Sequence, residues 1–340
     1  MQKVRVAMVG AGGRGMSHAS SMAAAPNVEF VAVCDIIEEL GKARAEEFGV
    51  EYLPNTKQLY GRGDIQAVGI CVQTPLHYEL AMEAITAGRH LLTEKPMAAT
   101  IAQAREMRDA AREKGLVAAI SYQLRMGPVF RKMKEICAQI NPLQVLFARQ
   151  RGMMSAKYLS PAPFDGIMDF ISHDIDMVPH LAGRAPTAVF ASFQRDTWAD
   201  AHAIEIIGAQ IEMGEGNDKA IGYISSSQGG AGIPQRLDVV GATGFAVASG
   251  DTITYSTDPN PPQGAPGRDL FSLSFEGQAR DFTLDLYQHW AACILNRDLD
   301  LAPAASYEDG YNALLLSLAI VKSGETGEKL NLADFAAAQA

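Results

Sequence analysis

The sequence predicts an α/β protein in which a doubly wound parallel sheet is followed by an α+β domain with a large, mostly antiparallel sheet. Up to about residue 117, short apolar runs alternate with helical patterns, as they do where helices connect parallel strands. Beyond residue 122, strand-like runs follow one another with glycine, proline and asparagine turns between them. We therefore expect a first domain over residues 1–121 and a second over residues 122–340.

The first domain opens with an apolar strand at residues 4–9, followed by a glycine-rich turn and a helix. The fully apolar run at 67–72 is typical of a parallel strand that is covered on both faces. The other expected elements are a strand at 28–34, a helix at 38–48, a helix at 76–87 ended by Gly88, a strand at 90–93, a helix at 100–113 capped by Thr100, and a strand at 116–120.

The second domain begins with a helix at 129–140, and most of its other elements are strands. Strands are expected at 143–149, 188–194, 204–213, 220–227, 237–240, 245–248 and 270–275. Two long loops, 225–234 and 257–268, have lengths associated with either function or mobility.

The turn after the first strand reads G-A-G-G-R-G at residues 10–15, and Asp35 ends the second strand. Gly10 permits a tight turn, Gly12 lets the backbone approach a pyrophosphate, and Gly15 lets the next helix pack closely. The carboxylate of Asp35 lies at the distance along the chain where it would accept hydrogen bonds from a ribose diol. With a strand before it and a helix after it, the motif predicts a bound dinucleotide.

The residues after Asp35 favour NAD over NADP as that dinucleotide. They are Ile36 and Ile37, where a protein that holds a ribose 2′-phosphate usually offers Arg or Ser. Arg14 and Arg44 keep NADP binding open. The residues assigned to cofactor binding are Gly10, Gly12, Gly13, Arg14, Gly15, Asp35, Thr74, Pro75, His77, Glu94, Lys95 and Gln123.

Composition argues against several classes of partner. The 340 residues are 48% hydrophobic, which is enough for two large cores, and the net charge of -10 leaves no broad basic surface for nucleic acid. No apolar run is long enough to cross a bilayer, and the first strand begins too early to leave room for a signal peptide. We therefore expect a cytoplasmic protein without nucleic acid or membrane partners.

Two polar turns follow neighbouring strands of the first domain. One is Thr74-Pro75 with His77, and the other is Glu94-Lys95-Pro96. Because open α/β sheets bind ligands beyond the carboxyl ends of their strands, Lys95 should project toward the cofactor. Pro96 lowers the energetic cost of a cis peptide bond at this bend. For His77, a helix cap or a surface position stays an alternative to ligand contact.

A polar stripe interrupts an apolar helix in the second domain. Asp169, His173, Asp176 and His180 recur on one helix face, and apolar residues cover the rest. We expect a buried helix whose stripe lines a cavity or is internally paired. A catalytic pair, a structural Asp-His pair and a metal site all remain open, but no further cluster of ligands accompanies the stripe, so we expect no metal.

The chain resembles the Gfo/Idh/MocA oxidoreductase family over nearly its whole length. The resemblance rests on residues 10–15, Asp35, Thr74-Pro75-His77, Glu94-Lys95-Pro96, the D-x-x-x-H-x-x-D pattern at 169–176, and a closing helix at 308–327. It implies a Rossmann domain and a C-terminal domain whose open sheet mediates homodimers or homotetramers. It also implies NAD(P)-dependent oxidation of sugars, cyclitols or related polyols, and it places Lys95, Asp169 and His173 at the family's catalytic positions.

The residue types suit that chemistry. His173 can accept a hydroxyl proton near neutral pH, and Lys95 can stabilise the developing alkoxide. Asp169 would orient the histidine or bind a neighbouring hydroxyl, and Arg125 joins these three as a substrate-binding residue. Residues 149–157 and 228–235 match no specificity pattern, so the substrate stays unnamed. Tyr287 is a candidate pocket residue, but a partly buried polar residue on a helix is the favoured interpretation.

Two other functions stay open at this point. A redox-neutral enzyme of the same fold would use NAD transiently to cleave a glycoside or epimerise a sugar. A non-catalytic regulator would only sense the dinucleotide, as some relatives of this fold do. The presence of Lys95, Asp169 and His173 argues against the regulator, because a sensor needs no base beside the nicotinamide.

Overall fold

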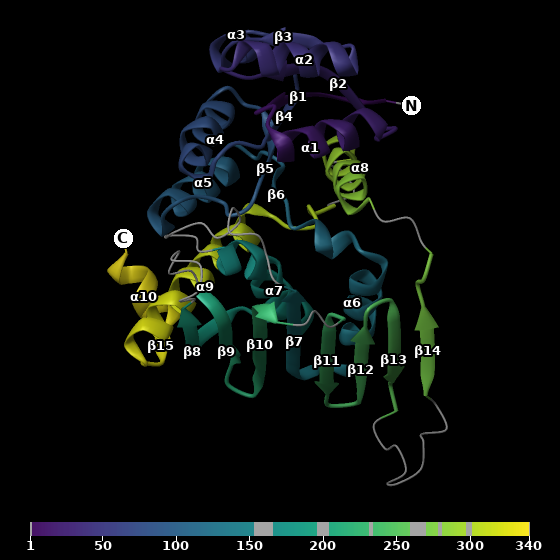
Figure 1. Cartoon of the computed structure of the whole chain (residues 1–340), viewed down its shortest axis with the longest axis vertical. Coiled ribbons are helices and arrows are strands. Elements are labelled where there is room, and N and C mark those ends of the chain that lie inside the picture. The colour runs from purple at the N-terminus through teal and green to yellow at the C-terminus, as the bar shows by residue number, and fades with distance from the viewer. Residues whose placement is uncertain are drawn as a thin grey trace. The chain divides into compact units, whose positions relative to one another are not determined.

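The computed structural model describes residues 2–152, 166–195, 204–230, 234–258, 270–277, 281–296 and 301–339. The chain forms two compact units (Figure 1). The first is Met1–Met126 with Arg280–Leu314, and the second is Gly127–Ala279 with Leu315–Ala340. The first unit thus takes in a late stretch of the chain that the proposed division at residue 121 assigns to the second domain.

The first unit contains a six-stranded sheet in the order β3-β2-β1-β4-β5-β6, and every pairing between neighbours is parallel. The strands are β1 (Val4–Val9), β2 (Val28–Cys34), β3 (Glu51–Leu53), β4 (Ala67–Ile70), β5 (His90–Thr93) and β6 (Ala118–Ile120). The order reverses between β1 and β4, so the turns after β1, β4 and β5 open at one edge, where such sheets bind ligands. The predicted doubly wound sheet is confirmed.

Helices connect these strands, and local sequence signals set their ends. They are α1 (Gly13–Ala24), α2 (Glu38–Phe48), α3 (Thr56–Tyr60), η1 (Thr74–Leu76), α4 (His77–Thr86), α5 (Ile101–Glu113) and η2 (Gln123–Met126). The Thr100 hydroxyl accepts a hydrogen bond from the Gln103 N–H at 3.2 Å, which confirms the predicted N-cap of α5. Gly88 has a positive φ of 71° just past α4, as expected of a residue that ends a helix.

A late part of the chain completes the core of the first unit. Helix α8 (Phe282–Leu295) and the first part of α9 (Tyr307–Thr326) belong to this unit, and α8 lies beside α1 (Figure 1). The Trp290 indole N–H donates to the Val117 carbonyl oxygen at 3.3 Å. The buried cluster that α8 joins includes Val4, Val6, Met8, Met22, Leu286, Tyr287 and Trp290.

The second unit contains a nine-stranded sheet in the order β14-β13-β12-β11-β7-β10-β9-β8-β15. The strands are β7 (Pro142–Gly152), β8 (Pro186–Arg195), β9 (Ile204–Glu215), β10 (Asp218–Gly230), β11 (Arg236–Gly241), β12 (Gly244–Ser249), β13 (Thr252–Ser256), β14 (Phe271–Ser274) and β15 (Leu330–Asn331). Strands β7 and β10 pair in parallel, and the other described pairings are antiparallel. The predicted mostly antiparallel sheet is confirmed.

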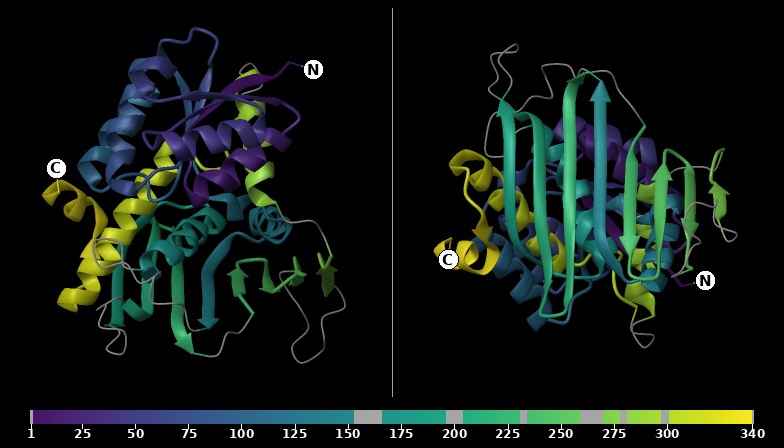
Figure 2. Two further views of the ribbon diagram at one scale, coloured as in Figure 1. Left: turned by 45° about the horizontal axis from the view of Figure 1, so that its top comes forward. Right: turned by 90° about the horizontal axis from the view of Figure 1, so that it is seen from below.

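The helices of the second unit are α6 (Pro128–Ile140), α7 (Gly166–Ala182), the later part of α9, and α10 (Leu332–Ala338). Helix α7 packs so closely on β10 that a Cβ added at Gly222 would lie 2.4 Å from Val178 Cγ1. The opposite face of the central strands is open (Figure 2, right). Within the described ranges, no helix of either unit is long and apolar enough to span a membrane.

The strand predicted at 220–227 is confirmed, but the overlapping loop predicted at 225–234 begins too early. Strand β10 continues through Gly230, with Ser225 opposite Ala148 on β7 and Gly208 on β9. The polar run Ser225-Ser226-Ser227 carries little apolar signal, but an inner strand is held by main-chain hydrogen bonds on both sides. Residues 231–233 lie outside the described residues, as does most of the loop predicted at 257–268.

The four cysteines are buried free thiols. Burial raises the pKa of Cys34, Cys71 and Cys137 to about 12 and that of Cys293 to about 11. A thiol that stays protonated is a poor nucleophile, so these residues serve as small core side chains.

Candidate active site

The glycine turn after β1 has the geometry that close packing demands. Gly10 adopts a φ of 95°, and a Cβ there would lie 2.3 Å from the Cys71 carbonyl oxygen. A Cβ at Gly15 would lie 2.2 Å from the Gly10 carbonyl oxygen. Neither position has room for a side chain, in agreement with the tight turn and the close helix packing expected of them.

Gly12 and Gly13 differ from these two glycines, because a Cβ at either would meet nothing within 4 Å. Gly12 is the N-cap of α1 and offers no side chain to the first-turn N–H groups, and that turn contains no acidic residue. Unpaired N–H groups at a helix start attract phosphate oxygens. The open space beside Gly12 therefore fits the diphosphate of a dinucleotide, approaching along the main chain.

Asp35 is held rigidly at the end of β2. Its Oδ2 accepts a hydrogen bond from the Ala11 N–H at 2.7 Å, and its Oδ1 accepts one from the Ile37 N–H at 2.8 Å. Each carboxylate oxygen keeps a second lone pair for a ligand hydroxyl. Ile36 and Ile37 are 86% and 58% exposed, so the two residues that follow the carboxylate present apolar side chains to solvent.

The two arginines that kept NADP binding open are both paired with glutamates. The Arg14 Nε atom donates to Glu94 Oε1 at 3.1 Å, and Arg44 Nη1 donates to Glu47 Oε2 at 2.7 Å. Gln123, in η2, orients its amide so that the oxygen accepts from Arg14 Nη2 at 2.8 Å and the nitrogen donates to the Ser121 carbonyl oxygen at 2.6 Å. Gln123 and Glu94 thus fix the Arg14 guanidinium from two sides.

Lys95 lies in the turn that follows β5, and its peptide bond with Pro96 is cis. Lys95 is half-buried, and its main-chain N–H donates to Glu94 Oε2 at 3.1 Å. Glu94 itself is buried. The Lys95 main chain is therefore anchored to a carboxylate inside the first unit.

His77 connects two of the turns at this edge of the sheet. Its Nδ1 lies 2.8 Å from the Pro96 carbonyl oxygen, and its Nε2 lies 3.1 Å from that of Val72. The ring is buried, and this burial lowers the pKa of His77. Thr74 and Pro75 form η1 just before it. The structure thus gives His77 a main-chain bridging role, and its contact with a cofactor stays a prediction.

Arg125 is engaged within the first unit. Its Nη1 donates to the Ala304 carbonyl oxygen at 2.7 Å, and its Nη2 donates to Asp309 Oδ1 at 3.0 Å. The side chain is buried, so it fastens the start of α9 to η2. Its predicted contact with a substrate stays a prediction.

The charge on Glu94 is set by its neighbours. Burial works to raise the pKa of this carboxyl, but His18, Arg14 and Lys95 together outweigh burial and lower it. His18 Nε2 lies 2.7 Å from Glu94 Oε1. A buried carboxylate with such partners stays ionised.

In the second unit, α7 is buried along residues 171–178, which confirms the expected buried helix. His173 and Asp176 lie in this stretch, and His180 is half-buried one turn further on. Asp169 lies in α7, but its side chain falls outside the described residues. Among the side chains that are described, no group of three or more His, Cys, Asp and Glu residues is arranged to hold a metal ion.

A buried ion pair fixes α7 against the sheet of its own unit. Arg149 Nη1 on β7 lies 3.1 Å from Asp174 Oδ1, and both side chains are buried. Arg149 Nη2 also donates to Gln235 Oε1 at 2.7 Å. Asp174 is next to His173 in sequence, so the pair fixes the helix at the position of the predicted base.

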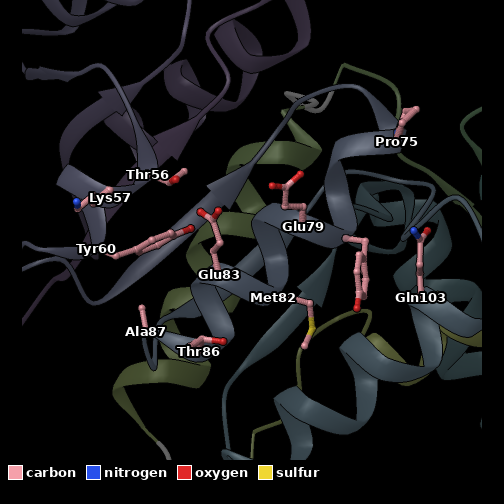
Figure 3. Close-up of a pocket in the computed structure, with 11 residues that line it drawn as sticks. Thr56, Lys57, Tyr60, Pro75, Glu79, Met82, Glu83, Thr86, Ala87 and Gln103 are labelled. Carbon is pink, nitrogen blue, oxygen red and sulfur yellow. The ribbon is translucent and has the colours of Figure 1, made fainter.

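A separate surface cavity of about 800 Å³ lies across α3, α4 and α5 (Figure 3). Tyr60 of α3 and Glu79 and Glu83 of α4 are among its lining residues. Of the predicted site residues whose side chains the structure describes, only Pro75 lines it. The cavity is therefore distinct from the glycine turn and from Lys95.

Sequence reasoning missed one residue behind Lys95, His18, and gave a second, Tyr287, only as a possible pocket residue. His18 and Tyr287 are both buried, and His18 Nδ1 lies 2.8 Å from the Tyr287 hydroxyl. A signal for His18 exists, because Gly15, Ala19 and Met22 mark the buried face of α1 at helical spacing and His18 shares that face. No local pattern links Tyr287 to a site so far away in the chain.

The reversal of strand order, the glycine turn and the fixed carboxylate define a dinucleotide-binding Rossmann protein. Residues 4–122 match the Gfo/Idh/MocA family, described as an oxidoreductase family with an NAD-binding Rossmann fold. Over these residues, the chain is similar to this oxidoreductase family.

Relatives of known name cover almost the whole chain. A myo-inositol 2-dehydrogenase of Thermotoga maritima is 26% identical over 342 residues, which cover 97% of this chain and 98% of the relative. A 1,5-anhydro-D-fructose reductase of Ensifer adhaerens is 29% identical over 319 residues, or 88% and 90% of the two chains. A levoglucosan dehydrogenase, solved with NADH and levoglucosan, shares the fold with a TM-score of 0.81, at 20% identity over 97% of this chain and all of that one.

Proposed function

We propose that the protein is an NAD-dependent dehydrogenase that oxidises a CH–OH group of a sugar or cyclitol, with Lys95, Asp169 and His173 as its catalytic residues. The observation that carries the proposal is a lysine at the end of β5, at the same sheet edge as the glycine turn and Asp35. Sugar- and cyclitol-converting relatives along the full chain support the substrate class.

The proposed roles follow from the residue types. NAD, when bound, accepts a hydride from the carbinol carbon. His173 takes the hydroxyl proton as the carbonyl forms, and the Lys95 ammonium stabilises the negative charge that develops on that oxygen. Asp169 orients His173 or binds a neighbouring hydroxyl of the substrate.

The surroundings of Asp35 support NAD over NADP. A 2′-phosphate placed at this carboxylate would meet its negative charge, and the flanking residues Ile36 and Ile37 provide no cation to offset that repulsion. Arg14 and Arg44 already hold glutamates. We expect NAD to bind at least about tenfold more tightly than NADP, a difference of ~1.4 kcal/mol. Asp35→Ala should reduce the difference between the two Kd values. It removes the carboxylate that accepts hydrogen bonds from the ribose of NAD, and with it the charge that repels the 2′-phosphate of NADP.

The test combines cofactor titration with a substrate panel. Fluorescence titration with NAD and with NADP measures the two Kd values, and tighter NADP binding would overturn the cofactor assignment. Reduced nicotinamide absorbance is then followed with inositols, aldoses, sugar acids and glycosides. Steady reduction with one compound class establishes the dehydrogenase and identifies its substrate class.

The two alternative functions give different results in the same test. If the protein binds NAD but reduces it with none of the compounds, it is not a dehydrogenase for any compound of the panel. Release of an aglycone without net reduction would show a redox-neutral enzyme. Binding of NAD without turnover of any kind would show a regulator.

We further propose that two or more copies associate through the open face of the nine-stranded sheet. Phe190, Ile206 and Ile221 are exposed there on neighbouring strands. The face also has a shallow depression of about 480 Å³, lined by residues that include Leu146, Phe190 and Tyr223. Exposed apolar side chains gathered in this way are typical of protein interfaces.

The oligomer is tested by sedimentation velocity. Wild-type protein should sediment as a dimer or larger, and Ile221→Lys should shift it toward the monomer because a charge would be buried at the interface. Leu301→Lys is the matched control, since Leu301 is an equally exposed apolar residue in the first unit. A monomeric wild type at every concentration would contradict the proposal.

A further inference from the structure

A chain of buried polar groups lies behind the Lys95 turn. The Tyr287 hydroxyl lies 2.8 Å from His18 Nδ1, and His18 Nε2 lies 2.7 Å from Glu94 Oε1. Tyr287 and His18 are 0% and 1% exposed, and Glu94 is buried as well. The three residues come from α8, α1 and the turn after β5, all within the first unit.

The partners define the direction of the hydrogen bonds. Glu94 also accepts from Arg14 Nε and from the Lys95 N–H, so it acts as an ionised acceptor and His18 Nε2–H is the donor toward it. Burial raises the pKa of Tyr287, so its hydroxyl keeps its proton and donates to His18 Nδ1. The chain thus runs from the tyrosine through the imidazole to the carboxylate, with the tautomer of His18 assigned from its partners.

We infer that His18 and Tyr287 are positioning residues for the proposed hydride transfer, because they hold Glu94 in the orientation in which its second oxygen fixes the main chain of Lys95. The inference rests on the proposed function, in which Lys95 stabilises the alkoxide. Glu94 Oε1 accepts hydrogen bonds from Arg14 and His18, and Glu94 Oε2 accepts one from the main-chain N–H of Lys95. A rotation of this carboxylate would therefore move the lysine away from its working geometry, and small misplacements of a catalytic group lower turnover strongly.

Packing around the chain supports a function beyond filling the core. A Cβ added at Gly69 would lie 2.8 Å from the Tyr287 hydroxyl and 2.3 Å from Met22 Cε, so this strand position leaves room for the hydroxyl only as glycine. The Tyr287 ring also meets His18 edge to face at 5.6 Å between centroids. Apolar residues of similar volume would stabilise such a core at least as well as a buried polar chain does.

The charged and titratable groups around Glu94 determine how it responds to pH. They are Arg14 and His18 on α1, Cys71 after β4, His77 at the start of α4, Lys95 in the same turn, and Tyr287 on α8. In the wild type, burial works to raise the pKa of Glu94, but His18, Arg14 and Lys95 outweigh it and hold that pKa below its ordinary value. Without His18, fewer groups oppose the effect of burial, so the pKa of Glu94 rises. Glu94 is then protonated at a higher pH than in the wild type.

The first test is Tyr287→Phe, which removes one hydroxyl and keeps the ring. We expect kcat to fall about fivefold, the effect of one lost hydrogen bond, while the Kd for NAD and the melting temperature change little. Tyr60→Phe is the matched control, because Tyr60 is a tyrosine of the same unit whose hydroxyl makes a long 3.5 Å contact with the Leu80 carbonyl oxygen. A wild-type kcat in Tyr287→Phe would overturn the positioning role of Tyr287.

The second test is the pH dependence of His18→Leu, with His18→Gln as the conservative variant. His18→Leu should lower kcat about 10- to 100-fold and add an acidic limb to its pH profile that the wild type lacks. His18→Gln keeps a donor toward Glu94 and should recover part of the activity. The double variant His18→Leu/Glu94→Gln has no carboxyl to protonate, so its profile should lack the new limb, a pattern that lost packing alone would not produce.

An infrared titration separates this inference from the proposed function. The carboxyl stretch of protonated Glu94 should grow on acidification of His18→Leu and be absent from the double variant, whether or not the protein turns over a substrate. If the band titrates as expected but no substrate is oxidised, the proposed function fails. The hydrogen bonds between Tyr287, His18 and Glu94 then have a structural role. If substrate is oxidised but His18→Leu and Tyr287→Phe match the wild type at every pH, the inference fails and the dehydrogenase stands.

Discussion

Lys95→Ala and His173→Ala are each expected to lower kcat about 10²- to 10⁴-fold while the Kd for NAD changes by less than about twofold. His173 would no longer supply the proton acceptor, and Lys95 would no longer supply the positive charge that stabilises the alkoxide. NAD binding depends mainly on the glycine turn and Asp35, which neither substitution touches. Steady-state kinetics and a fluorescence titration measure the two quantities separately.

Two control variants match these substitutions. Lys57→Ala removes an exposed lysine of α3 in the first unit, and His289→Gln alters a histidine of α8 that contacts the Ala302 carbonyl oxygen. Both should keep wild-type kcat. Normal turnover in Lys95→Ala or His173→Ala would remove that residue from the mechanism. Loss of NAD binding in either variant would instead indicate damage to the fold.

Gly12→Ala is expected to weaken NAD binding about 100-fold without loss of stability. The added methyl group meets nothing within 4 Å in the protein, so the fold tolerates it. It would, however, occupy the space where a diphosphate approaches the main chain. Gly15→Ala should act differently, because its methyl group would lie 2.2 Å from the Gly10 carbonyl oxygen and would have to push α1 off the turn. We expect Gly15→Ala to lower the free energy of unfolding by ~1–3 kcal/mol in addition to weakening NAD binding.

Thermal denaturation and NAD titration of the two variants, side by side, make the distinction. Gly63→Ala is the control, since a methyl group there also meets nothing within 4 Å and Gly63 lies outside the glycine turn. NAD binding by Gly12→Ala with wild-type affinity would show that the diphosphate does not pass beside Gly12. A melting temperature of Gly15→Ala equal to that of the wild type would show that α1 can shift at no cost.

The parts of the fold that sequence could predict are those with strong local signals. Strand β4 is a continuous apolar run, and β1 and β2 are apolar apart from Arg5 and Glu29. The turn after β1 has glycines where only glycine fits. Short or polar elements escaped prediction for physical reasons. Strand β15 has two residues and is defined by its pairing with β8, and the last residues of β10, 228–230, are polar or glycine and are held by pairing with β7. Neither has a periodicity to detect.

The same division applies to the site. The positions of the glycine turn, Asp35 and Lys95 could be predicted because each occupies a fixed place after a strand, while their contacts with a ligand stay predictions. The Arg14–Glu94 and His18–Glu94 contacts could not, because they depend on which side chains meet across separate strands and helices. Tyr287 is the clearest case, since its residue type allows many roles and only the docking of α8 brings its hydroxyl to His18.

The return of α8 and the start of α9 to the first unit bears on how the protein is made. The core of the Rossmann sheet includes Leu286, Tyr287 and Trp290, so it stays incomplete until those residues have left the ribosome. Residues 127–279, most of the second unit, are synthesised in the meantime. Until then Met8 and Met22 lack the neighbours that cover them in the finished protein, and exposed apolar surface of this kind is what chaperones bind. The nucleotide-binding half is therefore among the first parts of the chain to be synthesised and among the last to be finished.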